Sequence, residues 1–184
     1  MKTLDEHDRD QPYKPFPSAA FLMECTRRFE TEDLLAIVKS RQMMISWLVV
    51  ALCLWLGLTR TGQLIFFQSK KEDDANRLVD RAWGIYERLP EHVRKRVPAE
   101  RRFLKIVFPG RDVSIEGIPQ GADQIRSNTP SVLFSDEMAF QEECAGAYAA
   151  ALPAIMGIGS RRGKLIIVSS AAPGFFADLV EDLV

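Results

Sequence analysis

The sequence predicts an α/β domain in which helices flank a mostly parallel sheet. Short apolar runs with the length of buried strands alternate with longer segments that have helical spacing. Such alternation is typical of parallel strands that are joined by helical crossovers. At 184 residues, the chain is long enough for one well-packed domain. We expect residues 1–30 to form an N-terminal extension with an entry helix, and residues 31–184 to form the domain itself.

Composition and charge narrow the class of protein. Hydrophobic residues make up 47% of the chain and charged residues 27%, as in an ordinary globular protein. The formal net charge is −1, so any contact with nucleic acid must come from a local basic patch. The 3 cysteines are widely spaced and indicate neither a disulfide framework nor a zinc site, which fits a reducing compartment. The most apolar run, residues 47–58, is too short to span a bilayer, so we expect a buried helix and no membrane contact.

The N-terminal part is predicted to be irregular up to the first helix. Residues 1–12 are polar, and we expect them to be poorly ordered. Residues 13–17 form an extended segment with aromatic side chains, which either stack on a nucleotide base or pack on the core. Residues 18–31 then have the apolar spacing of a short helix.

The remaining elements follow from the period of the apolar residues. The predicted strands are residues 34–38, 63–68, 132–134 and 164–168, with a β-hairpin formed by 103–108 and 112–118 around Pro109-Gly110. The predicted helices are residues 46–58, 69–89, 140–156 and 175–184. Two segments are predicted as connections. One is the basic segment between Pro90 and Pro98, which either touches DNA phosphates or is a solvated link. The other is the loop 121–127, which carries Arg126.

The segment from Lys39 to Ser46 lies between a predicted strand and the apolar helix. A strand, an eight-residue loop and a helix that begins at Ser or Thr have the layout of a phosphate-binding loop. Backbone N–H groups at such a helix start can hold phosphates, and Ser46 would offer its hydroxyl to Mg²⁺. The standard Walker A loop has glycine at its first and sixth positions and lysine at its seventh, where this chain has Lys39, Met44 and Ile45. The sequence pattern alone is therefore not a Walker A motif.

Two adjacent carboxylates, Asp136 and Glu137, follow the apolar run 132–134 after Ser135. Ligands of open α/β sheets bind outside the carboxyl ends of the strands. Two acids at such a place suit a metal ligand and a base that activates water, whereas the alternative is a strand that ends in a solvated acidic turn. Ser169 and Ser170 likewise follow the run 164–168, so polar groups from three strand ends are expected to converge on one crevice.

In combination, these motifs resemble the ATPase domain of large terminase subunits, the DNA-packaging motors of tailed phages. The resemblance covers about residues 13–184, and the segments that carry it are 39–46, 108–111, 124–126, 132–137 and 168–171. It implies a P-loop NTPase of the ASCE type with a β-hairpin insertion.

The resemblance also implies a role for each residue of the deviant phosphate loop. The nucleotide-binding residues would be Lys39, Ser40, Arg41, Gln42, Met43, Met44, Ile45 and Ser46. Arg41 matches the basic residue that such terminases place early in the loop, and Lys39 is the second candidate. A guanidinium can contact phosphate oxygens in a bidentate way. Met44 stands where glycine is usual, so we expect a strained backbone, at a cost of about 1–3 kcal/mol, and weak nucleotide affinity.

Catalytic roles follow from the same resemblance. Asp136 would hold Mg²⁺ together with Ser46, and Glu137 would orient and deprotonate the attacking water. Arg126 matches the arginine that is inserted into the site of a neighbouring subunit, which makes hydrolysis depend on assembly into a ring. The segment Ser169-Ser170-Ala171 matches the motif that couples the γ-phosphate state to DNA movement.

The implied function is ATP hydrolysis that drives double-stranded DNA into a procapsid in the cytoplasm of the bacterial host. The implied partners are DNA, a homo-oligomeric ring, the portal protein and the small terminase subunit. Full-length terminases continue into a lid and a nuclease domain, and this chain ends where the lid should begin, so we expect no nuclease activity.

Two alternatives remain. In the first, a degenerate P-loop domain acts only in assembly; Met44 and Ile45 favour it, and the intact pair of Asp136 and Glu137 argues against it. In the second, the chain is a helicase-like P-loop ATPase, which shares the same site chemistry.

Overall fold

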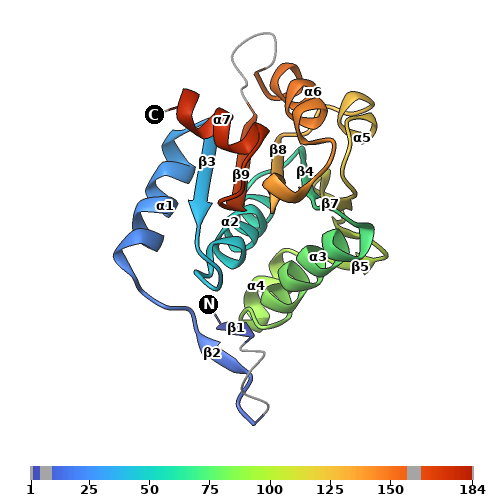
Figure 1. The fold of residues 1–184 in the computed structure, drawn as a ribbon. Coiled ribbons are helices and arrows are strands. Elements are labelled where there is room, and N and C mark those ends of the chain that lie inside the picture. Colours follow the sequence, from blue (N-terminus) through green and yellow to red (C-terminus); the bar gives the residue numbers. More distant parts are fainter. Residues whose placement is uncertain (1, 5–9, 157–162, 184) are drawn as a thin grey trace.

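The computed structural model describes residues 2–4, 10–156 and 163–183, and it confirms the α/β class predicted from the sequence (Figure 1). The strands are β1 (Lys2–Leu4), β2 (Tyr13–Pro15), β3 (Leu34–Lys39), β4 (Gln63–Gln68), β5 (Glu100–Arg102), β6 (Lys105–Phe108), β7 (Val113–Ile118), β8 (Val132–Asp136) and β9 (Lys164–Ser170). The helices are α1 (Ala20–Thr31), α2 (Ile45–Thr59), α3 (Glu72–Glu87), α4 (Glu91–Arg96), α5 (Asp123–Arg126), α6 (Cys144–Met156) and α7 (Phe175–Asp182), with a short 3-10 helix, η1 (Met138–Phe140).

The main sheet brings together strands that are far apart in the sequence. It has 7 strands in the order β3-β9-β8-β4-β7-β6-β5. The strands from β3 to β7 in this order are parallel, whereas β6 and β5 extend one side in antiparallel fashion. Strand β9 comes last in the chain yet lies between β3 and β8, so the carboxyl ends of these three strands are neighbours.

Alternate side chains of the central strands enter two apolar layers. On β4, Ile65 and Phe67 pack with α1, α2 and α3, whereas Leu64 and Phe66 pack with α5, α6 and α7. This follows from the two-residue period of a strand that is buried on both faces. Phe67 also packs edge-to-face against Phe134 of β8, with 5.8 Å between the ring centroids. The two helix layers can be followed in Figure 1.

Most of helix α2 is buried, which fits its apolar composition, although Trp55 is 44% exposed. Val50, Cys53 and Leu54 are at most 1% exposed, and the helix contacts α1, α3 and the sheet. The run predicted as a buried helix is therefore part of the domain core. Within the described ranges, no helix is long and apolar enough to cross a membrane.

Several short elements differ from the sequence prediction. The segment between Pro90 and Pro98, predicted as a connection, contains α4, and the predicted loop 121–127 contains α5. The predicted two-strand hairpin has a third strand, since β5 pairs with β6. Strand β1, in the part predicted to be poorly ordered, pairs with β2, and residues 5–9 of that prediction lie outside the described residues. None of these elements exceeds 6 residues, so tertiary contacts decide their formation.

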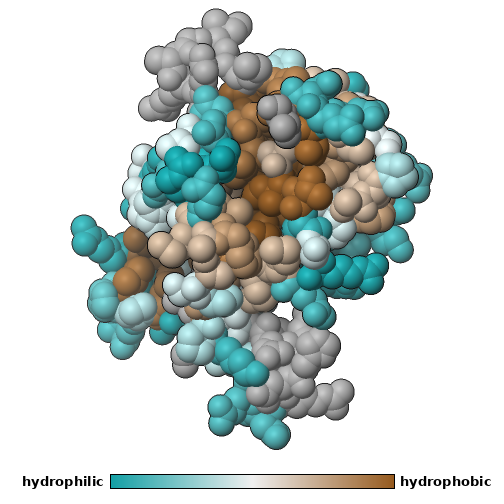
Figure 2. Space-filling model, turned by 60° about the vertical axis from the view of Figure 1, so that its left-hand side comes forward, coloured by the Kyte–Doolittle hydropathy of each residue, from teal (hydrophilic) through white to brown (hydrophobic). Residues whose placement is uncertain are grey.

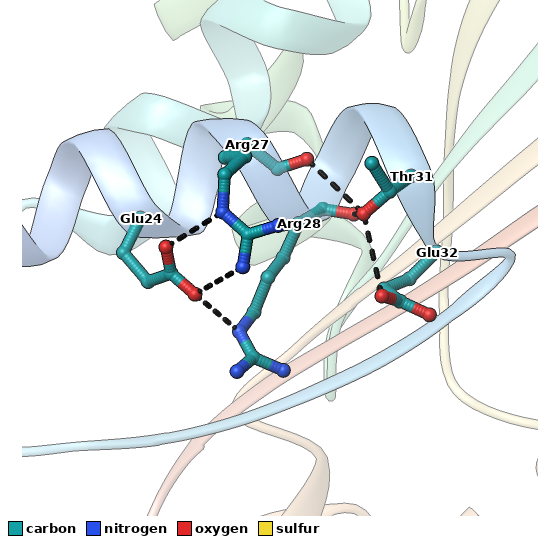
Figure 3. A network of polar contacts seen from close by, with 5 residues as sticks. All are labelled: Glu24, Arg27, Arg28, Thr31 and Glu32. Atoms are coloured by element: carbon teal, nitrogen blue, oxygen red, sulfur yellow. Dashed lines mark hydrogen bonds and ion pairs between the residues drawn. The ribbon is translucent and has the colours of Figure 1, made fainter.

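Helix α1 carries a polar network on its outer surface (Figure 3). Oε1 of Glu24 accepts hydrogen bonds from Arg27 at 2.7 Å and from Arg28 at 2.8 Å. The hydrogen bonds from Arg27 and then Arg28 lower the pKa of Glu24 to about 2. These side chains are exposed, so water screens the ion pairs and they contribute little to stability.

The side of the molecule that carries α1 and β3 shows a continuous apolar patch bordered by polar side chains (Figure 2). Strand β3 ends the sheet on this side, and in the described part of the chain it pairs only with β9. Val38 of β3 is 49% exposed. The outer edge of β3 thus lies at the surface beside apolar side chains.

Two glycines allow a test of the packing between α3 and β7. A Cβ atom on Gly117 would lie 3.1 Å from the backbone of Ala75, whereas one on Gly146 in α6 would meet no atom within 4 Å. We expect Gly117→Ala to lower the free energy of unfolding by about 1–3 kcal/mol, because a backbone contact cannot yield. The control, Gly146→Ala, should raise it by about 0.5–1 kcal/mol. Urea unfolding followed by circular dichroism measures both values, and a neutral Gly117→Ala would contradict this packing.

Candidate functional site

The carboxyl ends of β3, β8 and β9 form the floor of the candidate site. Lys39 at the end of β3 lies opposite Ser170 of β9, and Asp136 at the end of β8 lies opposite Val168. Glu137 follows Asp136 directly. The convergence of three strand ends is the arrangement expected from the sequence, and the position of β9 between its two neighbours produces it.

Hydrogen bonds join the phosphate loop, the acid pair and β9. The hydroxyl of Ser46 donates to Oδ1 of Asp136 at 2.6 Å. Lys39 Nζ forms an ion pair with Oε1 of Glu137. The backbone N–H of Ser170 donates to Oε2 of Glu137 at 3.1 Å, and the Ser169 hydroxyl lies 3.4 Å from the same oxygen. Of the six residues that the resemblance connects to metal, water or coupling chemistry, five take part in these contacts, and the sixth, Ala171, does not.

The phosphate loop adopts a strained backbone. Gln42 and Met44 have φ angles of 62° and 60°, in the left-handed region that favours glycine. Met44 directly precedes α2, which begins at Ile45 rather than at Ser46. Ile45 is 2% exposed and packs into the core, although it also borders the cavity beside the loop, so an apolar side chain stands at the position of the standard lysine. Two residues of the segment from Lys39 to Ser46 thus adopt a backbone conformation that favours glycine, although the segment contains no glycine.

The structure separates the two basic candidates of the loop. The side chain of Lys39 is 9% exposed and contacts the acid pair, whereas Arg41 is exposed. Lys39 has the same strand parity as Leu35 and Ile37, which face α2, so it points to the side where Asp136 lies. This parity was a signal in the sequence that would have favoured Lys39.

Two cavities meet at the acid pair. The first has a volume of about 630 Å³ and extends between the phosphate loop and the N-terminal segment. The second, of about 690 Å³, extends toward the start of α3 and the end of β9 and includes Arg41 and Ala171. The residues that line both cavities are Lys39, Gln42, Arg81, Asp136 and Glu137.

The extended N-terminal segment packs on the core through Phe16, which is one of the two roles that its sequence left open, and stacking on a base stays a prediction. Pro15 and Pro17 line the first cavity, whereas Phe16 packs against the core. Tyr13 lies beside α3, with the Arg88 guanidinium 3.5 Å from its ring centroid. The segment is therefore fixed over the opening of the loop.

Burial and neighbouring charges shift the two carboxyl pKa values in opposite directions. Burial, with a further contribution from Glu137, raises the pKa of Asp136, although the Ser46 hydrogen bond and the charges of Lys39 and Arg81 oppose the shift. Partial burial alone would raise the pKa of Glu137, but hydrogen bonds from Lys39 and the Ser170 backbone outweigh it and lower the pKa. Glu137 is thus ionised at neutral pH and able to accept a proton, while the charge on Asp136 is under-compensated.

The donor set fits a magnesium ion. Asp136 and Ser46 present a carboxylate and a hydroxyl oxygen side by side, and Mg²⁺ prefers oxygen ligands. No group of three or more His, Cys, Asp or Glu side chains arranged for a metal occurs among the described residues. Mg²⁺ is commonly held by one or two carboxylates together with substrate phosphates, so this small donor set suits a metal that arrives with a nucleotide.

Sequence reasoning did not identify Arg81. It lies on α3, lines both cavities and stacks its guanidinium 5.4 Å from the ring centroid of Trp47. Asp74 and Arg77, which also line the second cavity, precede it at helical spacing. Because α3 follows the carboxyl end of β4, this polar stripe was a signal that could have been read from the sequence.

The remaining predicted site residues lie in different surroundings. Arg126 is the last residue of α5, and its side chain is 65% exposed and outside the linings of both cavities. Its role in a neighbouring site stays a prediction. Ser40 is exposed, Met43 packs partly against the core, and Ser169 is fully buried. The Ser169 hydroxyl accepts a hydrogen bond from the backbone N–H of Ala139 at 3.1 Å, which ties β9 to the turn after the acid pair.

Asp136 gives a stability prediction with a defined sign. Its pKa in the folded protein is raised, so the ionised carboxylate costs stability as the pH rises above the ordinary value of about 4. We expect Asp136→Asn to raise the Tm at pH 7 by roughly 2–4 °C, equivalent to about 1 kcal/mol. The gain should disappear below about pH 4, where the wild-type carboxyl group is protonated. The exposed Asp178→Asn serves as a control, and an unchanged or lower Tm for Asp136→Asn would contradict the burial argument.

Comparison with known proteins supports the fold assignment. No family model and no curated protein matches the sequence. Among solved structures, the large terminase of bacteriophage HK97 has a TM-score of 0.66 at 14% identity, over 85% of this chain and 34% of that one. An arginine-to-alanine variant of the ATPase domain of the Thermus phage P74-26 large terminase has a TM-score of 0.61 at 18% identity. The match covers 97% of this chain and 74% of that one.

A third match is the large terminase of the thermophilic bacteriophage D6E in complex with ADP, with a TM-score of 0.58 at 15% identity. It covers 83% of this chain and 39% of that one. The present chain thus spans about a third of the HK97 protein and about two fifths of the D6E protein. The chain has the fold of the ATPase domains of phage large terminases.

Proposed function

We propose that this chain is the ATPase motor domain of a phage DNA-packaging terminase, which hydrolyses ATP to drive double-stranded DNA into a procapsid. The observation that carries the proposal is the contact of the Asp136-Glu137 pair with Ser46 and Lys39 of the phosphate loop. This set provides a metal ligand, a base and a phosphate-binding cation at one place on the terminase ATPase fold.

Phosphate binding would be shared by the start of α2 and Lys39. The first backbone N–H groups of a helix have no partner within that helix, and the helix dipole favours an anion there. Lys39 adds a positive charge at the edge of the same loop. The first cavity, between the loop and Pro15 and Pro17, would take the nucleoside, since its volume of about 630 Å³ is typical of cofactor sites.

Asp136 and Ser46 would hold Mg²⁺, which neutralises developing charge on the phosphates. Glu137 would accept the proton of the attacking water. Lys39 forms an ion pair with Oε1 of Glu137, so the base is partly neutralised. Phosphate oxygens compete for the Lys39 ammonium group, and their binding would release Glu137 for its role.

The proposal includes assembly and partners. Arg126 would complete the site of a neighbouring subunit in a homo-oligomeric ring, and its exposed position on α5 is compatible with that role. Ser169, Ser170 and Ala171 would report the γ-phosphate state, because two of them contact Glu137. The other partners would be double-stranded DNA, the portal protein and the small terminase subunit, in the cytoplasm of the bacterial host.

A second candidate is a degenerate P-loop domain that binds no nucleotide and acts only in assembly. The left-handed backbone at Met44 and the buried side chain of Ile45 favour it. The intact network around Asp136 and Glu137 favours hydrolysis instead.

Substitution of the base tests the proposal. Glu137→Gln keeps the size of the side chain but removes proton acceptance, so we expect Mg²⁺-dependent ATP turnover to fall by about 10²–10⁴-fold. Binding of a fluorescent ATP analogue should stay within about 3-fold of wild type, because the phosphate loop is unchanged. The exposed Glu181→Gln is the matched control. Unchanged turnover in Glu137→Gln would refute the mechanism, and absence of analogue binding to wild type at millimolar concentration would favour the assembly domain.

A second comparison decides which basic residue serves the phosphates. We expect Lys39→Ala to weaken binding of the analogue by at least about 10-fold, because it removes a nearly buried charge from the site. Arg41→Ala should weaken it by less than about 3-fold, since an exposed charge in water contributes little. Fluorescence titration at fixed ionic strength measures both constants. The reverse order of effects would assign the role to Arg41.

A further inference from the structure

Three buried polar side chains lie under the acid pair, outside both cavities. Gln68 at the end of β4 and Ser135 of β8 are each 1% exposed, and Gln141 after η1 is 3% exposed. Ser135 has the opposite strand parity to Asp136, so this cluster lies on the other face of the sheet from Ser46. None of the three lines either cavity.

One end of this cluster holds the turn of the acid pair. The amide nitrogen of Gln141 donates to the carbonyl oxygen of Asp136 at 3.0 Å and to the Ser135 hydroxyl at 3.1 Å. Oε1 of Gln141 is buried and has no hydrogen-bond partner among the described residues. A buried amide with one unsatisfied oxygen lowers stability, so packing alone does not account for glutamine at this position.

The other end holds the loop before α5. The Ser135 hydroxyl reaches Oε1 of Gln68 over 3.5 Å. The amide nitrogen of Gln68 donates to the carbonyl oxygen of Gly121 at 2.9 Å, with the carbonyl oxygen of Pro119 at 3.4 Å. Hydrogen bonds thus run without a break from the Asp136 backbone to Gly121.

Gly121 is joined to Arg126 through a short helix. The backbone N–H of Arg126 donates to the carbonyl oxygen of Ala122, the residue after Gly121, at 2.9 Å. Ile125 is fully buried and anchors α5 in the core layer next to α6. A displacement at Gly121 therefore moves the base of α5, and the exposed Arg126 side chain at its end moves with it.

We propose that Gln68, Ser135 and Gln141 form a relay within each subunit. Through this relay, the state of the acid pair sets the position of Arg126 in the same subunit, and that Arg126 serves the site of the neighbouring subunit. The relay rests on the proposed function, because it assigns a use to Arg126 there. Gln68 and Ser135 are positioning residues that act through Arg126 and do not touch the nucleotide. A buried, hydrogen-bonded set of side chains transmits displacement because its members cannot move independently.

Hydrogen exchange tests the relay without nucleotide. Gln68→Met keeps the side-chain volume and removes the bonds to the loop, whereas Ser135→Ala breaks the middle of the relay and leaves Gln68 bonded to Gly121. We expect both variants to speed amide exchange by about 10-fold in residues 120–127, with Ser135→Ala also acting on 137–141. The matched control is Gln63→Met at the opposite end of β4, where the amide nitrogen donates to the carbonyl oxygens of Thr61 and Gly62. Unchanged exchange at 120–127 in Ser135→Ala would overturn the relay.

Subunit mixing tests its direction. Alone, Gln68→Met should lower kcat about 5-fold with KM within about 2-fold of wild type, in the range of long-range coupling. An excess of Glu137→Gln subunits should restore the turnover of each Gln68→Met subunit. These donors contribute little turnover of their own, and their Gln68, Ser135 and Gln141 are unchanged, so the donor's Arg126 serves the Gln68→Met site. Arg126→Ala mixed with the same donor is the reference. If the donor restores turnover in Arg126→Ala but not in Gln68→Met, then Gln68 acts on the site of its own subunit, and the relay is overturned.

The two proposals fail separately. If wild type has no ATPase activity, or if Arg126→Ala is not restored by mixing, the proposed motor function or its ring fails. The exchange measurements on Ser135→Ala still decide whether the acid pair and α5 are coupled, because they require neither nucleotide nor assembly.

Discussion

The insertion of β9 between β3 and β8 is the constraint on which the site depends. Strand β9 is hydrogen-bonded both to β3, which carries the phosphate loop, and to β8, which carries the acid pair, and it supplies the backbone N–H of Ser170 to Glu137. Because β9 is the last strand in the chain, the site exists only after residues more than a hundred positions apart have paired. Such non-local parallel pairing is slow to form. The organisation of the site is therefore a property of the complete sheet and not of the loop motif.

The two adjacent acids, Asp136 and Glu137, differ in their electrostatic surroundings. Burial against the sheet leaves the charge of Asp136 under-compensated, which suits a cation, while Lys39 and Ser170 stabilise the ionised form of Glu137. Asp136 and Glu137 are consecutive residues, but the left-handed backbone conformation of Glu137 (φ 52°) turns its side chain toward β3 and β9. Two carboxyl groups with pKa values shifted apart are a recurrent basis for distinct roles in one site.

Much of the fold could be predicted from the sequence because long, periodic segments dominate it. The strand over 63–68 and the helix that follows it were visible as apolar patterns, and Asp136 could be located by its place after a buried run. The short helices α4 and α5 could not be predicted, since one or two turns are stabilised only by tertiary contacts. Sequence reasoning missed Arg81, Gln68 and Gln141 for a related reason. The role of a single polar residue can be recognised only when the order of the strands places it beside a partner that is far away in the sequence.

The edge position of β3 has a mechanical consequence for the site. The strand that carries the phosphate loop is hydrogen-bonded on one side only in the described part of the chain, whereas β8, which carries the acid pair, is bonded on both sides by β9 and β4. Displacing β3 disturbs one ladder of backbone bonds, and displacing β8 disturbs two. The crevice therefore has a compliant wall and a stiff wall, because a displacement of the loop on β3 disturbs fewer backbone hydrogen bonds than a displacement of the acid pair on β8.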